Sequence, residues 1–322
     1  MGWSAAIESA EKFVPVLQDR APDLVDEMKG VADGAGVSFR DILALNARSE
    51  IALGMMDDGC TTVAWSTTSF SVAGQNWDWE DEQKGQLILL HIIPEPSSNK
   101  PTISQVTEAG IIGKIGLNSA RVAIFLNAIA AKGVDYSSLP IHLTLRKALE
   151  ATSREQAVEA LNSFGLASSG HVMVADSSAA TSLESSSLGI VRLDMKDDWI
   201  AHTNHFLAQQ DPRIRDTVLW PDSLPRMERA KTLLATASAQ LAQSPPESPA
   251  SVIQRLLEDE QGLPTSINRK SSPESLGSTL FSITTDLTAG TAVVKLGRPS
   301  EPEEIWALKP DEDAPVRLFP DS

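Results

Sequence analysis

The chain has 322 residues, of which 42% are hydrophobic, so it can bury a sizeable core in one large domain or two smaller ones. Lys and Arg total 27 against 43 Asp and Glu, a formal net charge of -16. Nucleic acids and anionic membranes attract positively charged proteins, so this balance argues against both as partners.

The sequence contains no visible membrane span or targeting segment. The longest apolar runs are short, and the run over residues 87–93 is interrupted by His91. The first residues lack a basic segment followed by an apolar one, and the last residues carry no peroxisomal or prenylation signal. One unpaired cysteine suits a reducing compartment, so we expect a cytoplasmic protein.

Residues 1–59 have the patterns of helices. Ser4 is expected to cap a helix that reaches Gln18, and a second helix is expected over residues 23–32. Ser38 and Asp41 have the spacing of a capping box and should begin a third helix, which leads the chain towards Gly59.

The pattern changes after residue 60 to strands that alternate with pairs of helices. This alternation predicts a layered α+β fold. Helices are expected from Pro140 to Leu149 and over residues 153–164, 226–241 and 250–259, with a break at Pro221 to Pro225. The expected strands cover residues 61–70, 75–79, 86–93, 103–107, 111–115, 122–127, 171–175, 182–184, 190–193, 199–203, 279–284, 292–296 and 305–309.

Cys60 is the only cysteine of the chain, so it cannot form an internal disulfide. A thiol becomes a nucleophile once a neighbouring base takes its proton, and the hydroxyls of Thr61 and Thr62 could bond groups nearby. A free cysteine is also among the most buried residue types and often packs as a small hydrophobe. Composition alone leaves both interpretations open.

Other clusters carry weaker signals. His202 and His205 lack the cysteine or carboxylate neighbours of a zinc site, so no metal is expected. Trp77 and Trp79 lie two residues apart on an expected strand and share one face, so the carboxylate of Asp78 points to the other face. Asp78 is therefore a candidate partner for the thiol.

Five segments stand out in order along the chain: residues 58–62 (DGCTT), 74–78 (GQNWD), 107–114 (TEAGIIGK), 202–205 (HTNH) and 296–299 (LGRP). Together they resemble the motifs of the fungal isopenicillin N acyltransferase family, which belongs to the cysteine N-terminal-nucleophile hydrolases. The resemblance implies a single domain over residues 1–322 with a four-layer αββα fold, built on two stacked antiparallel sheets.

The resemblance also implies that the chain cuts its own Gly59–Cys60 bond by an N-to-S acyl shift. Fragments 1–59 and 60–322 should stay together as a heterodimer. The freed α-amine of Cys60 would have a pKa of about 7.7 to 8.0, which suits a general base at neutral pH, whereas a peptide nitrogen is no base. No cofactor is expected; acyl-CoA would be a co-substrate.

The family pattern assigns roles to further residues. It makes Asp78 a partner of the Cys60 amine and thiol, and Asn204 a donor to the oxyanion of the tetrahedral intermediate. The other positions expected to bind substrate are Thr61, Thr62, Glu108, Ser275 and Leu276.

Two features depart from that pattern. Leu276 stands where the family has Arg, so we expect an acceptor that lacks the carboxylate of a penicillin nucleus, or one whose carboxylate other groups hold. The segment before Cys60 is also shorter than in the family, which indicates an earlier start site or a missing edge strand.

From these expectations we infer an enzyme that forms a thioester on Cys60 and passes the acyl group from acyl-CoA to an amine, in secondary metabolism. The alternative is an amidohydrolase that cleaves N-acyl amides with water as the acceptor. A catalytically dead scaffold that serves as a binding module is disfavoured because Cys60, Asp78 and Asn204 are all present.

Overall fold

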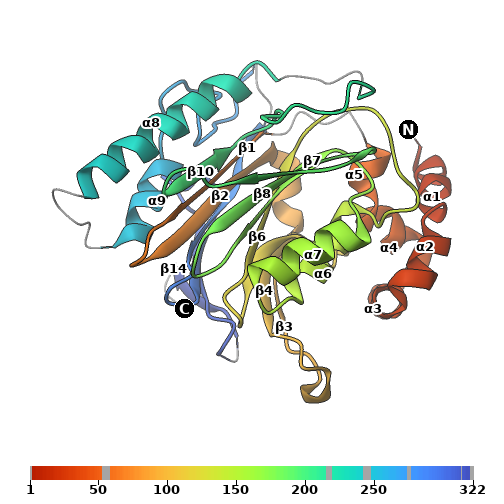
Figure 1. The fold of residues 1–322 in the computed structure, drawn as a ribbon. Coiled ribbons are helices and arrows are strands. Elements are labelled where there is room, and N and C mark those ends of the chain that lie inside the picture. Colours follow the sequence, from red (N-terminus) through yellow and green to blue (C-terminus); the bar gives the residue numbers. More distant parts are fainter. Residues whose placement is uncertain are drawn as a thin grey trace.

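The computed structural model describes residues 2–52, 59–214, 220–241, 248–273, 277–312 and 314–319. Two seven-stranded sheets lie face to face between two layers of helices (Figure 1). Helices α8 (Ser223–Leu241) and α9 (Pro249–Leu257) cover the outer face of the first sheet. Helices α6 (Ile141–Leu149) and α7 (Arg154–Phe164) cover the outer face of the second. The predicted four-layer αββα architecture is confirmed.

Both sheets are antiparallel between all paired strands. The first sheet has the order β10-β1-β2-β11-β12-β13-β14, and the second runs in sequence order from β3 to β9. The strands of the first sheet are β1 (Gly59–Ser66), β2 (Ser71–Glu80), β10 (Trp199–His202), β11 (Gly277–Asp286), β12 (Thr291–Leu296), β13 (Glu304–Leu308) and β14 (Val316–Phe319). Those of the second are β3 (Leu87–Ile92), β4 (Ile103–Glu108), β5 (Ile115–Asn118), β6 (Ala123–Ala128), β7 (Gly170–Ala175), β8 (Ala180–Ser186) and β9 (Gly189–Asp194).

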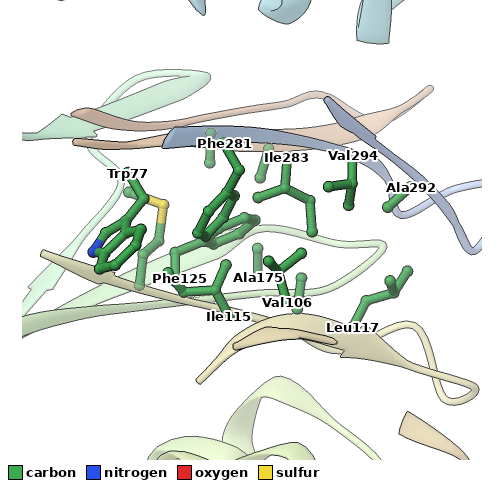
Figure 2. Close-up of a cluster of buried hydrophobic side chains, with 14 of the residues drawn as sticks. Trp77, Val106, Ile115, Leu117, Phe125, Ala175, Phe281, Ile283, Ala292 and Val294 are labelled. Carbon is green, nitrogen blue, oxygen red and sulfur yellow. The ribbon is translucent and has the colours of Figure 1, made fainter. Parts of the chain in front are cut away.

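The main hydrophobic core fills the space between the two sheets. Side chains of β2, β11 and β12 point towards side chains of β4, β5, β6 and β7, and Trp77 lies at one end of this row (Figure 2). Every residue of β1 is buried, because α8 packs on its outer face and the second sheet lies beneath it. The start of β1 therefore lies deep inside the protein, at the end of the core where Trp77 sits.

The first 51 residues form five helices that pack as a separate group (Figure 1). They are α1 (Trp3–Glu11), α2 (Val14–Arg20), α3 (Pro22–Ala35), α4 (Phe39–Asn46) and α5 (Arg48–Ile51). Their apolar faces share one cluster with Ile112, Leu139 and Leu143 of the later chain. The buried carboxylate of Glu50 accepts hydrogen bonds from the backbone N–H of Ile141 (3.0 Å) and from Ser168 (2.9 Å). The segment before Cys60 is thus an integral part of the core.

Several predicted elements agree with the structure in detail. The Ser38 hydroxyl accepts from the backbone N–H of Asp41 and the Asp41 carboxylate accepts from that of Ser38, so the predicted capping box is present. Ser153 caps α7 through the N–H of Gln156, but the Gln156 side chain binds Thr152 instead of completing a box.

Other boundaries differ for identifiable reasons. The predicted first helix is split, because Pro15 cannot donate a backbone hydrogen bond and instead opens α2; Ser4 caps neither part. Residues 111–114 form no strand, since the side chain of Gln105 bonds the backbone of Ile112 and Lys114 in place of a neighbouring strand. Helix α8 begins at Ser223 and accommodates Pro225 in its first turn, where no intrahelical donor is needed.

Strand β14 was not predicted. It has four residues, most of them exposed, and no alternation of apolar and polar side chains that a sequence pattern would reveal. The described part of the chain also forms two short 3₁₀ helices, η1 (Asp81–Gln86) and η2 (Pro96–Ser98). Among the described helices, none is both long and apolar enough to cross a membrane.

Candidate active site

The site is built around the first two residues of β1. In the pairing of β1 with β2, Gly59 lies opposite Asp78 and Cys60 opposite Trp77. Cys60 is 1% exposed and belongs to the core between the sheets. Burial by itself fits the hydrophobic interpretation of this cysteine, so the nucleophile interpretation depends on the polar groups around it.

Those neighbours hold the Cys60 backbone from both sides. Its N–H donates to Asn204 Oδ1 (2.8 Å), and its carbonyl oxygen accepts from Arg226 Nη1 (2.6 Å). Arg226 Nη2 also donates to Asn204 Oδ1 (2.8 Å), while Asn204 Nδ2 donates to the carbonyl oxygen of Ala128 (3.0 Å). The amide oxygen of Asn204 accepts two hydrogen bonds and its amide nitrogen donates one, so these partners fix the orientation of the Asn204 side chain.

Asp78 lies on the opposite face of β2 from Trp77 and Trp79, as the alternation predicts; the two indole rings stack at 5.4 Å. Thr279 donates to Asp78 Oδ1 (2.7 Å). Asp78 Oδ2 has no hydrogen-bond donor among the described residues and lies 3.7 Å from Arg269 Nε. Burial raises the pKa of Asp78 to about 6, although Arg269, Arg226 and the Thr279 hydroxyl act in the opposite direction.

The residue before Cys60 has to be glycine here. A Cβ atom at position 59 would lie 2.7 Å from Asp78 Oδ2 and 2.8 Å from Arg269 Nη2. Both atoms belong to buried side chains that hydrogen bonds or ion pairs hold in place, so neither could move away at low cost. The absence of a side chain brings the carboxylate of Asp78 directly against the backbone that leads into Cys60.

A family model described as acyl-coenzyme A:6-aminopenicillanic acid acyl-transferase matches residues 65–301. The chain belongs to this family. The matched range contains Asp78 and Asn204 and begins after Cys60.

A curated relative agrees with this assignment. The acyl-coenzyme A:6-aminopenicillanic-acid-acyltransferase 40 kDa form of Emericella nidulans is 38% identical over 298 residues, which cover 91% of this chain and 80% of the relative. The protein is therefore an enzyme of an acyltransferase family, and the family resemblance inferred from the five motifs is confirmed.

Solved structures show the fold of this acyltransferase-family protein. The Caenorhabditis elegans N-acylethanolamine-hydrolyzing acid amidase ortholog superposes with a TM-score of 0.51 at 15% identity, over 71% of this chain and 93% of that one. A conjugated bile acid hydrolase from Clostridium perfringens gives 0.55 at 12% identity, over 80% of this chain and 96% of that one. The fold is that of the N-terminal-nucleophile hydrolases.

A pocket opens at the end of the core marked by Trp77, which lies opposite Cys60 in the pairing of β1 with β2; Cys60 itself does not line it. Its walls come from α5, β2, β6, the start of α6 and the segment before α8, and most of them are apolar. The lining residues are Arg48, Ser49, Ala52, Trp77, Trp79, Lys114, Leu126, Asn127, Ala128, Ile129, Ala130, Ile141, His142, Ser169, Gly170 and Trp220. Trp77 thus packs in the core between the two sheets and also lines the pocket.

Glu108 joins two cations of the pocket wall. It lies 2.7 Å from Lys114 Nζ and 2.5 Å from Arg48 Nη2. Burial opposes ionisation of Glu108, but Lys114 and Arg48 lower its pKa to about 2. Burial lowers the pKa of Lys114 to about 7, with Glu108 and more weakly Cys60 acting to raise it. Glu108 therefore stays ionised at neutral pH, and burial makes Lys114 easier to deprotonate than an exposed lysine.

The remaining predicted residues lie at varying positions. The Thr61 hydroxyl accepts from Arg226 Nη1 (3.1 Å) and that of Thr62 donates to Asn127 Oδ1 (2.7 Å), so both side chains are bonded within the protein. Neither lines the pocket, and their assignment to substrate binding stays a prediction. Ser275 and Leu276 lie outside the described residues.

Several charged residues of the site, including Arg48 and Asp222, were not singled out from the sequence. Arg226 and Arg269 are both nearly buried and both bond the carboxylate of Asp222, and Lys114 was quoted only as part of a motif. A charged residue at the start of a helix or in a loop is usually exposed, so no local pattern distinguishes these positions. Within the described ranges, no group of three or more His, Cys, Asp or Glu could hold a metal ion.

The pKa of Asp78 leads to a test of its electrostatic environment. The folded protein binds the Asp78 proton more tightly than the unfolded chain, so this group stabilises the fold below about pH 4, and its contribution is lost as the pH rises through about 6. A rise from 3.8 to about 6 corresponds to about 3 kcal/mol. The test compares the free energy of unfolding in urea of Cys60→Ala with that of the same protein carrying Asp78→Asn. Between pH 4 and 8, the variant with Asp78→Asn should become more stable relative to Cys60→Ala alone by up to about that amount.

Asp41 provides a control whose pH dependence has the opposite sign. Hydrogen bonds from Ser38 and Trp3 lower the pKa of Asp41, so its ionised form stabilises the fold. Asp41→Asn should lose relative stability as the pH rises. If the difference in stability between the Asp78→Asn variant and its background does not change with pH, the environment assigned to Asp78 is wrong.

Proposed function

We propose that this acyltransferase-family enzyme cuts its own Gly59–Cys60 bond and then uses the new N-terminal Cys60 to transfer an acyl group from acyl-CoA to an amine. The observation that carries the proposal is the placement of the Cys60 nitrogen. It already bonds Asn204, next to a buried carboxylate oxygen of Asp78 that lacks a donor among the described residues. A free ammonium or amine at this position would supply that donor.

The cleavage step would begin with the thiol. Cys60 Sγ attacks the carbonyl carbon of Gly59 and loses its proton, and the C–N bond then breaks as the nitrogen is protonated. The product is a thioester between the Gly59 carbonyl and Cys60, with a free α-amine. Water then attacks the thioester, releasing the Gly59 carboxylate and returning the thiol. We propose that fragments 1–59 and 60–322 remain together as a heterodimer.

The cleaved enzyme would repeat the same chemistry on a substrate. The α-amine takes the thiol proton, the thiolate attacks the acyl-CoA carbonyl, and CoA leaves as a thiol with that proton. An acceptor amine then attacks the Cys60 thioester and the C–S bond breaks. One proton of the amine passes to the departing Cys60 sulfur, so the product leaves as an amide and the thiol is restored. Asn204 Oδ1 would hold the α-amine, and the second proton of Asn204 Nδ2 would serve the oxyanion.

Support for a transferase comes from the family and from the Emericella nidulans relative, whose name gives acyl-coenzyme A and 6-aminopenicillanic acid. We infer acyl-CoA as the donor and an amine as the acceptor, with no cofactor. Since Leu276 replaces the family Arg, we expect poor acylation of 6-aminopenicillanate itself. The single cysteine supports a cytoplasmic location.

The first prediction concerns cleavage. Protein produced in a foreign host should contain fragments 1–59 and 60–322, which co-purify without a covalent link and are identified by intact mass. Cys60→Ala should remain whole because it lacks the attacking thiol. Gly59→Ala should be cleaved poorly, because its Cβ would meet Asp78 and Arg269. Wild-type protein that is fully active and entirely uncut would rule out self-cleavage.

The second prediction concerns Asn204. Asn204→Ala removes an oxyanion donor and the acceptor for the Cys60 amine, so turnover should fall by about 100- to 1000-fold while the protein still folds. Asp78→Asn should also lower turnover severely. The control is Asn162→Ala, whose side chain bonds only its own helix α7. Near wild-type turnover by either site variant would remove that residue from the active site.

The third prediction separates transferase from hydrolase. Cleaved enzyme given a panel of acyl-CoA thioesters should gain an acyl group on Cys60, detected by mass, and added amines should remove it faster than water does. If N-acyl amides are turned over while no acyl-CoA labels Cys60, the transferase proposal fails and the amidohydrolase is correct.

A further inference from the structure

The polar wall of the pocket has a feature that the proposed steps do not use. Glu108 stands between Lys114, which is 1% exposed in its side chain, and Arg48, which is 20% exposed. Arg48 comes from α5, before the proposed cleavage point, and Lys114 from the segment that leads into β5. Lys114 Nζ also lies 3.2 Å from the centre of the Trp77 ring, and the Arg48 guanidinium lies 5.1 Å from that of Trp79.

Among the described residues, the charges of this wall balance only when Lys114 is neutral. Each oxygen of Glu108 faces one cation, so two cations share one carboxylate. Arg48 Nε is buried and has no hydrogen-bond partner there. The adjoining His142 is neutral, because burial and the two cations lower its pKa to about 3. With Lys114 protonated, the described wall carries one positive charge in excess.

The surroundings make that excess unfavourable in an empty pocket. Apart from this cluster, the walls consist mainly of Trp77, Trp79, Trp220 and aliphatic side chains. A buried cation without a counter-ion costs free energy, and an orphaned guanidinium donor adds to this cost. A ligand that brings one negative charge and an apolar body would remove both costs.

We propose that this pocket binds the carboxylate of an apolar substrate between Arg48 and Lys114. The planar fork of a guanidinium matches the two oxygens of a carboxylate, and Lys114 adds a second cation on its other side. Trp77 lies opposite Cys60 in the pairing of β1 with β2 and packs on Lys114, so the bound molecule would lie near the proposed nucleophile. The inference rests on the proposed function only in treating the ligand as a substrate.

The test uses a matched pair of ligands, 3-phenylpropionate and 3-phenylpropionamide, which differ in charge but hardly in shape. Calorimetric titration of the purified protein should show the carboxylate binding about 10- to 100-fold more tightly than the amide, the range expected for hydrogen bonds to charged groups. Inorganic phosphate, which lacks the apolar body, should bind weakly.

Substitutions of the two cations test whether they cause the preference for the carboxylate over the amide. Arg48→Met and Lys114→Met should each reduce it to within about threefold, because either variant leaves Glu108 paired with the remaining cation. Arg48→Lys should retain part of it. The control is Arg40→Met, an exposed arginine of α4 that pairs with Glu11, and it should behave as wild type. Equal affinity for the two ligands, or an unchanged preference in both Met variants, would overturn the proposal.

Proton uptake gives a second measure. Lys114 faces Glu108, Arg48, His142 and Cys60, and a ligand carboxylate would favour its charged form. Titrations at pH 8 in buffers of different ionisation enthalpy should therefore show uptake of a fraction of a proton with 3-phenylpropionate, and none in Lys114→Met. Absence of uptake in the wild-type protein would contradict the role of Lys114.

The result is independent of acyl transfer. A protein that prefers the carboxylate but is never labelled by acyl-CoA contradicts the proposed function and leaves this site standing. A protein that acyl-CoA labels on Cys60, but that does not distinguish the two ligands, contradicts only the carboxylate site.

Discussion

The guanidinium of Arg226 holds together three parts of the chain that are far apart in sequence. It bonds the Cys60 carbonyl oxygen, the Asn204 side chain and the Asp222 carboxylate, and it is 2% exposed. A buried arginine is stable only when nearly all its donors are bonded, so it fixes the groups around it. The start of β1, the loop after β10 and the first turn of α8 are therefore placed as one unit.

Arg226 and Arg269 face Asp78 and Asp222 in a buried group of balanced charge. Among the described residues, the pocket wall next to it carries one positive charge in excess when Lys114 is protonated. The first arrangement suits a centre that must keep its geometry through a reaction in which protons move but no net charge enters. The second arrangement suits a binding site in which the ligand supplies the negative charge that the wall lacks. Cys60 bonds Arg226 of the first cluster and lies opposite Trp77, which packs on Lys114 of the second, so the proposed nucleophile has a rigid set of charges on one side and an adaptable one beyond Trp77.

Sequence patterns predicted the layered α+β fold, most of the strands and the orientation of Asp78, because apolar alternation and helix caps are local signals. The αββα arrangement and the roles of Cys60 and Asn204 came from the family motifs instead. Arg226 and Arg269 could not be found in this way, since their burial results from contacts between distant segments. Residues 111–114 looked like a strand because they are apolar, but the side chain of Gln105, whose partners no pattern reveals, occupies their backbone.

The helices before Cys60 do more than precede the proposed nucleophile. They contribute Arg48, Ser49 and Ala52 to the pocket, and their apolar faces complete a cluster with residues of the later chain. A chain engineered to begin directly at Cys60 would have the N-terminus that we propose for the active enzyme, yet it would lack one wall of its pocket and expose Ile112, Leu139 and Leu143 to water. Synthesis as one longer chain therefore supplies both the buried thiol and the scaffold that encloses it.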